Sequence, residues 1–286
     1  MRIVNKVVAS VDQSRFADYV ADYAAWAAQR MNSPLEFLHI IDRHTEISTG
    51  RDHSGAIGID AQETLLAELS NEDELRSKAA REQGRIFLNR LCERAKEAGV
   101  EFPDIRQRHG TLEEILVEQE KGVRLFVLGR RGESAEITRR DLGRNVERVA
   151  RALHKPILTV TEGFKEPRRI MIAFDGSIVT RRGVKMVAAS QLFRGLPIHL
   201  LMSGKQSKEA PKQLQWAKTT LEAADFEVPT SLIPGDAESI IAKTVQEQHI
   251  DMLMGAYAHS PLRSLLFGSK TTDLLRSATI PTMLLR

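Results

Sequence analysis

Short apolar runs alternate along the chain with longer segments in which apolar residues recur every three or four positions. Runs at residues 6–11 and 169–174 are each followed by an aspartate, Asp12 and Asp175. Continuous apolar runs of this length are typical of strands buried on both faces of a parallel sheet. Because helical spacing follows each run, the pattern predicts α/β architecture with parallel strands and right-handed crossovers.

The pattern is repeated in the second half of the chain. Three pairs of residues are each 125 positions apart: Gly110 and Gly235, Gly143 and Gly268, Pro156 and Pro281. A repeat of this length predicts two copies of a whole domain, at residues 1–162 and 163–286. We expect each copy to be a doubly wound, five-stranded parallel sheet of flavodoxin-like order 3-2-1-4-5, with helices on both faces.

The first copy is longer than the second. Asp12 and Asp175 are 163 positions apart, which is 38 more than the spacing found later in the chain. We assign the excess to an insertion at about residues 42–98, which reads as a polar loop followed by a long helix. Residues 162–168 read as the linker between the copies.

The predicted strand order brings candidate ligand-binding residues together. Ligands of doubly wound sheets bind at the carboxyl ends of the strands, where the strand order reverses. Strands one and four would end there, at Asp175 and Gly255 in the second copy. Gly268 and Ser269 precede a helical pattern, and N–H groups at a helix start can hold a phosphate. Ordinary turn and N-cap chemistry is the more frequent reason for such residues.

With these residues the chain resembles the universal stress protein family in its tandem form. Members carry an aspartate after strand one and, after strand four, a loop of the form Gly-x2-Gly-x9-Gly-Ser/Thr. Here that loop places Gly255, Gly268 and Ser269 at matching positions, with Ala258 where the second glycine belongs. The resemblance implies cytoplasmic stress-response proteins that pair through their last strands. Some members bind ATP, and the family has no common catalytic reaction.

The resemblance also implies a nucleotide site, for ATP or a related adenine nucleotide with Mg²⁺, chiefly in the second copy. Asp175 would lie at the nucleotide sugar and Met202 at the adenine. The residues carried over are Asp175, Met202, Gly255, Ala258, Arg263, Gly268, Ser269 and Lys270. The first copy has a weaker set, because its loop is one residue longer and an arginine replaces the Ser/Thr: Asp12, Gly129, Gly132, Gly143 and Arg144.

Composition narrows the function classes. A net charge of +3, without a long basic run with interleaved aromatics, argues against nucleic acid as a partner. No apolar run reaches the roughly 20 residues of a membrane span. The one cysteine, Cys92, cannot form an internal disulfide, which suits a reducing cytoplasm. The histidines lack metal-ligand spacing, and no nucleophile-and-base motif is recognisable, so catalysis, including weak ATP hydrolysis, stays an open question.

Three functions remain as hypotheses. The leading one is a cytoplasmic sensor or adaptor that binds an adenine nucleotide and presents a surface to a protein partner. The second is a nucleotide-free scaffold, an internal pseudo-dimer paired through residues 157–160 and 282–285, with a homodimer as a further assembly. The third is a binder of another small ligand in the same crevices, because fold alone does not fix function.

Overall fold

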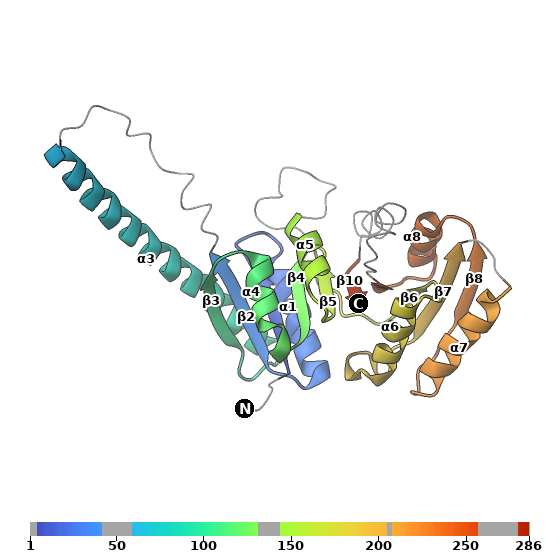
Figure 1. Ribbon diagram of the computed structural model, residues 1–286. Coiled ribbons are helices and arrows are strands. Elements are labelled where there is room, and N and C mark those ends of the chain that lie inside the picture. The colour runs from blue at the N-terminus through green and yellow to red at the C-terminus, as the bar shows by residue number, and fades with distance from the viewer. Residues whose placement is uncertain (1–4, 42–58, 131–143, 205–207, 257–279, 286) are drawn as a thin grey trace.

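The computed structural model describes residues 5–41, 59–130, 144–204, 208–256 and 280–285, without the side chains of 59–74, 76–77, 144–145 and 256. Helices and strands alternate along both halves (Figure 1). The first half contains β1 (Lys6–Val11), α1 (Ala17–Met31), β2 (Leu35–Ile41), α3 (Ile59–Glu97), β3 (Asp104–His109), α4 (Leu112–Gln119), η1 (Glu120–Gly122), β4 (Val123–Gly129), α5 (Arg144–Ala152) and β5 (Ile157–Val160). The second contains β6 (Ile170–Phe174), α6 (Ile178–Ala189), η3 (Gln191–Phe193), β7 (Ile198–Gly204), α7 (Ala210–Glu222), β8 (Thr230–Pro234), α8 (Ala237–Glu247), β9 (Met252–Ala256) and β10 (Thr282–Leu285).

The strands form one continuous sheet of order β3-β2-β1-β4-β5-β10-β9-β6-β7-β8. Within each half the order is the predicted 3-2-1-4-5, with parallel neighbours. The halves meet where β10 pairs antiparallel with β5, Met283 lying opposite Leu158. The Thr159 hydroxyl donates to the Thr282 carbonyl at 3.0 Å across this junction. The fifth strand of each half is therefore paired within the chain.

Side-chain caps fix where several helices begin. Thr111 caps α4: its hydroxyl oxygen accepts the Glu114 N–H, and the hydroxyl donates to the Glu114 carboxylate at 2.7 Å. The Asp236 carboxylate caps α8 by accepting the Ser239 N–H at 3.0 Å. These polar residues satisfy N–H groups that the first helical turn leaves without partners.

The apolar core is shared between the halves. One cluster of buried residues runs from β1 and α1 across to α6, α7 and β9. Cys92 belongs to it, and burial raises the pKa of its thiol to about 11, so the thiol is neutral at physiological pH. Leu284 of β10 joins a separate cluster made otherwise of first-half residues. Core packing therefore crosses the junction that the strands form.

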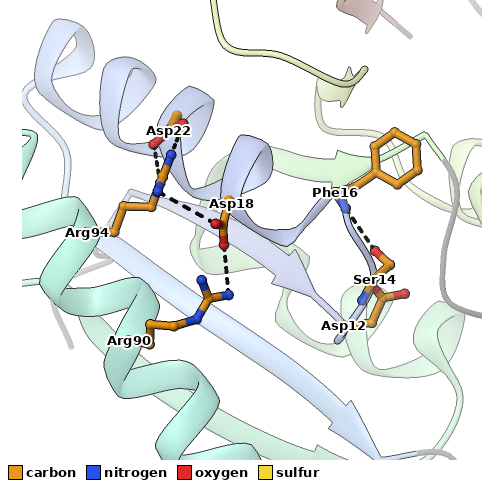
Figure 2. A network of polar contacts seen from close by, with 7 residues as sticks. All are labelled: Asp12, Ser14, Phe16, Asp18, Asp22, Arg90 and Arg94. Carbon is orange, nitrogen blue, oxygen red and sulfur yellow. Dashed lines mark hydrogen bonds and ion pairs between the residues drawn. The ribbon is translucent and has the colours of Figure 1, made fainter.

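Helix α3 is attached to the body through its C-terminal part. It contacts α1, β2 and β3. Figure 2 shows Arg90 and Arg94 reaching Asp18 and Asp22 of α1. Arg94 binds Asp22 with two hydrogen bonds, of 2.6 and 2.8 Å, and Arg90 lies 2.7 Å from Asp18. The N-terminal part of α3 runs out beyond the sheet edge at β3 (Figure 1).

The segment between the halves, residues 162–168, is bound by residues of both halves. The Tyr23 hydroxyl of α1 donates to the Lys165 carbonyl at 3.2 Å, and the Phe164 ring packs edge-on against Tyr23. Asp251 accepts the N–H groups of Arg168 and Arg169, and its carboxylate lies 2.5 Å from the Lys165 ammonium.

Candidate functional site

The aspartate after β6 is part of a turn that starts a helix. Gly176 has φ 76°, a value suited to glycine, and Ser177 then caps α6 by accepting the Thr180 N–H. The Asp175 Oδ1 atom accepts the Ser177 N–H at 2.9 Å and the Thr180 hydroxyl at 2.7 Å. Both bonds use one carboxylate oxygen, and the residue is exposed, so the turn orients Asp175 at the surface of the sheet end.

Adjacent strands bring two more predicted residues to this end of the sheet. Ile172 of β6 pairs with Met254 of β9, so Asp175 and Gly255 follow from neighbouring strand ends. Phe174 pairs with Met202 of β7, which is buried. Asp175, Met202 and Gly255 thus lie at one end of the sheet. The other predicted residues of this set lie outside the described residues: Ala258, Arg263, Gly268, Ser269 and Lys270.

The first half repeats this arrangement. Asp12 follows β1 and accepts the Ser14 N–H at 3.2 Å. Ser10 pairs with Leu128, so Asp12 and Gly129 follow from the neighbouring ends of β1 and β4. Arg144 is the first residue of α5, although its side chain is not described. Gly132 and Gly143 lie outside the described residues.

A histidine distinguishes the two crevices. His39 pairs with Val11 in β1–β2, as Met202 pairs with Phe174 in β6–β7, so His39 occupies the first-half position of Met202. Its Nδ1 atom lies 3.0 Å from the Val11 carbonyl oxygen, and its ring meets Phe87 of α3 edge-on at 5.6 Å. Sequence reasoning assigned His39 no functional role. The signal was present in the sequence, because adding the 163-residue spacing between Asp12 and Asp175 to position 39 gives Met202.

Helix α3 also covers part of the first crevice. A hollow of about 530 Å³ lies between the turn after β1 and α3. It is lined by Gln13, Ser14, Gln83, Ile86, Phe87 and Arg90. Among the described residues, the second half contains no counterpart of the N-terminal part of α3. The two crevices therefore differ in their surroundings, although their aspartates are placed alike.

A cation–aromatic stack lies beside the Asp175 turn. Trp216 of α7 stacks on Phe174 with ring centroids 6.4 Å apart, and the Arg181 guanidinium lies 4.8 Å from the Trp216 ring centroid. Arg181 also donates from Nε to the Gly176 carbonyl at 3.0 Å. α6 brings Arg181 onto α7, a tertiary contact that a sequence pattern does not contain.

Neither a metal centre nor a membrane helix is recognisable in the described part. Among the described residues, no three His, Cys, Asp or Glu side chains are grouped so that they could hold a metal ion. No helix of the described residues is long and apolar enough to cross a membrane.

Comparison with known proteins adds independent findings. The model of the universal stress protein family matches residues 4–161 and 202–286. The universal stress protein Slr1230 of Synechocystis sp. is 30% identical over 287 residues, covering 99% of this chain and 100% of the relative.

Solved structures agree at the level of the fold. A universal stress protein from Archaeoglobus fulgidus superposes with a TM-score of 0.70 at 16% identity, covering 98% of this chain and 96% of that one. A protein described as a putative universal stress protein, from Pseudomonas aeruginosa, gives 0.61 at 16% identity, covering 99% and 93%.

Proposed function

Since this chain belongs to the universal stress protein family, we propose that it is a cytoplasmic stress-response protein that binds an adenine nucleotide. The site lies in the second half, between the carboxyl ends of β6 and β9. Nucleotide binding changes the surface that the protein offers to a partner, so that it acts as a sensor or adaptor. The observation that carries the proposal is that Asp175 follows β6 and Gly255 lies near the end of the adjacent strand β9, at the point where the strand order reverses.

The chemistry of the described residues suits a nucleotide. Asp175 Oδ1 accepts both hydrogen bonds from its own turn. Oδ2 has no hydrogen-bond donor among the described residues, so it can accept hydrogen bonds from ribose hydroxyls. Met202, paired with the residue before Asp175, offers an apolar surface to a purine ring. Gly255 contributes no side chain to the neighbouring end of β9, and none of the described residues lies within 4 Å of the place a Cβ would take. The glycine loop after β9 would supply N–H groups for the phosphates, with Gly268, Ser269 and Lys270 as the proposed contacts.

We assign the nucleotide site to the second half because the corresponding positions of the first half carry different residues. In the first half His39 stands at the Met202 position and is held by Val11 and Phe87. Arg144 stands there in place of the hydroxyl residue of the family loop. We therefore assign the first crevice no nucleotide, or a weaker affinity for one.

Titration calorimetry with a matched pair of variants tests this assignment. Mg·ATP and AMP are titrated into the full chain and into Asp175→Asn and Asp12→Asn. Asparagine retains the Oδ1 acceptor of each turn, so both variants are expected to fold. We expect Asp175→Asn to weaken binding at least about tenfold, as for the loss of a charge-assisted hydrogen bond, and Asp12→Asn to leave it unchanged.

Other results would favour a different site or a different function. Gly268→Val should abolish the heat of binding if the loop after β9 holds the phosphates. Binding lost only in Asp12→Asn would move the site to the first half. No heat with either nucleotide would favour the nucleotide-free scaffold, in which the pairing of β5 with β10 makes the internal pseudo-dimer.

A further inference from the structure

Side chains of α6 and α7 contact the turn that contains Asp175. The Nε atom of Arg181, in the first turn of α6, donates to the Gly176 carbonyl at 3.0 Å. The guanidinium of the same residue lies 4.8 Å from the centroid of the Trp216 ring on α7. A planar guanidinium can stack on an indole ring and donate a hydrogen bond from its edge at the same time, which the compact ammonium of a lysine cannot do.

Two further contacts of α7 reach the residues on either side of Asp175. Trp216 stacks on Phe174, the preceding residue, with ring centroids 6.4 Å apart. The following residue, Gly176, has φ 76°, and an added Cβ there would overlap the side-chain oxygen of Gln213. The backbone on both sides of Asp175 is therefore packed against α7.

The backbone of this turn determines the orientation of the Asp175 carboxylate. Its Oδ1 atom is bonded to the Ser177 N–H at 2.9 Å and to the Thr180 hydroxyl at 2.7 Å, and both donors follow Gly176 in the chain. A rotation of the Gly176 peptide would move these donors, and the carboxylate would move with them. Arg181 binds the carbonyl of that peptide and so opposes the rotation.

The first half has an equivalent helix pair with different side chains at the contact. The buried residues of α7 correspond to those of the C-terminal part of α3 at an offset of 126: Ala210, Leu214, Ala217 and Leu221 to Gly84, Leu88, Leu91 and Ala95. This offset pairs Trp216 with Arg90, and the offset of 163 pairs Arg181 with Asp18. Arg90 and Asp18 form an ion pair of 2.7 Å, shown in Figure 2.

The ion pair of the first half joins the helices but differs in what it can offer the turn. A carboxylate at position 18 accepts hydrogen bonds and has no N–H to donate to a backbone carbonyl. The residue at the Gly176 position is Gln13, which carries a side chain. A contact between the two helices is thus present in both halves, whereas the guanidinium that donates to the turn is present in the half to which we assign the nucleotide.

We propose that Arg181 is a positioning residue of the second-half site. It fixes the turn of residues 175–177 in the conformation that presents the Asp175 carboxylate to the ligand, and Trp216 keeps Arg181 in place. Arg181 acts through Gly176 and need not contact the ligand itself. This role rests on the nucleotide site proposed above.

Titration calorimetry with three variants of the full chain tests the effect on affinity. Arg181→Met removes the hydrogen bond and the charge but retains an apolar stem, and we expect it to weaken Mg·ATP binding about three- to tenfold, as for one lost hydrogen bond. Arg181→Lys should lie between this variant and the unchanged chain, because it keeps the cation without the planar edge. Arg182→Met is the matched control, since Arg182 is exposed on the same helix, and it should bind as the unchanged chain does.

Hydrogen exchange without nucleotide separates positioning from general packing. The Ser177 N–H is bonded to Asp175, and the Thr180 N–H is bonded to the Ser177 hydroxyl oxygen. Arg181→Met should accelerate exchange of these two amides, measured by NMR, and leave that of Val187 further along α6 unchanged. Trp216→Leu should accelerate the same two amides, and the double variant should add little, because Arg181 and Trp216 act as one unit.

Three results would overturn the positioning role. They are unaltered exchange of the Ser177 and Thr180 amides in Arg181→Met, an equal acceleration along the whole of α6, and an equal loss of affinity in Arg182→Met. An unchanged chain that binds no nucleotide would instead overturn the proposed function, and the exchange rates would still show whether Arg181 fixes the turn.

Discussion

At the scale of the residue, the same chemical group serves different purposes at different places. Asp175 is exposed, and one oxygen of its carboxylate accepts two hydrogen bonds within its own turn. Asp251 is 8% exposed and binds the Lys165 ammonium and two backbone N–H groups. Burial alone would raise the pKa of Asp251, but these partners outweigh it and hold that pKa below its usual value. Asp251 therefore holds the segment between the halves, whereas Asp175 is the residue that we propose for contact with a ligand.

Asp251→Asn should destabilise the protein in a pH-dependent way. A carboxyl whose pKa is lowered by folding stabilises above its unfolded pKa of about 3.9, and this contribution is lost as the pH falls through the folded value. We expect a loss of about 1–3 kcal/mol at pH 7, typical of a hydrogen bond to a charged group, and a shrinking difference below about pH 4. Urea unfolding at both pH values measures it.

Asp225→Asn is the control for that measurement. Asp225 is exposed, with φ 64°, a conformation that asparagine tolerates. Its substitution should change the free energy of unfolding by less than about 0.5 kcal/mol. An equal effect of the two substitutions would contradict the role assigned to Asp251.

At the scale of the element, the four-residue strand β10 joins the two halves. Its residues are all buried. Leu284 packs among first-half residues, whereas the Leu285 side chain lies against α6 at Gly183, where an added Cβ would come within 2.8 Å. Successive residues of a strand point to opposite faces of the sheet, so one short strand contributes to two layers of packing.

Leu284→Ala should therefore weaken the first half although it lies in the last strand. A buried leucine truncated to alanine costs about 2–5 kcal/mol. We expect that loss in urea unfolding, together with reduced amide protection in β5 by hydrogen exchange. Ile178→Ala, at a residue 70% exposed, should change stability by less than about 0.5 kcal/mol. Unchanged protection in β5 would contradict the junction's role.

At the scale of the whole molecule, the two halves share one sheet and one principal core. The buried cluster extends through both halves. Arg30 of α1 also donates to the Leu192 carbonyl at 2.6 Å and to the Arg194 carbonyl, both in the second half. Neither half can open without exposing part of the other.

Thermal unfolding should accordingly be a single transition. When two halves share a core, the loss of one removes packing from the other, so they unfold together. Differential scanning calorimetry should give one peak, with a calorimetric enthalpy close to the van't Hoff value. Two resolved peaks would show that the halves are energetically independent despite their shared sheet.

Much of the architecture could be predicted from local patterns. The apolar runs that end in an aspartate predict β1 and β6. The 125-residue repeat predicts the strand order 3-2-1-4-5 that each half shows, although the two halves form one continuous sheet. The caps at Thr111 and Asp236 each join a side chain to an N–H three positions later in the sequence. These features depend on burial and on local hydrogen bonds, which produce residue patterns of fixed spacing in the sequence. The exposure of Leu75 and Ile86 does not, because an apolar residue at helical spacing reads the same whether or not a partner covers it.

The sequence by itself determined the class of fold, its duplication, and the aspartates at the ends of the first strand of each half. Tertiary structure alone decided that His39 bonds to Val11, that Arg181 stacks on Trp216, and that α3 projects beyond β3. The physical reason is the distance along the sequence between the residues that interact. Periodicity and capping arise between residues a few positions apart, whereas these contacts join side chains that only the folded sheet brings into reach.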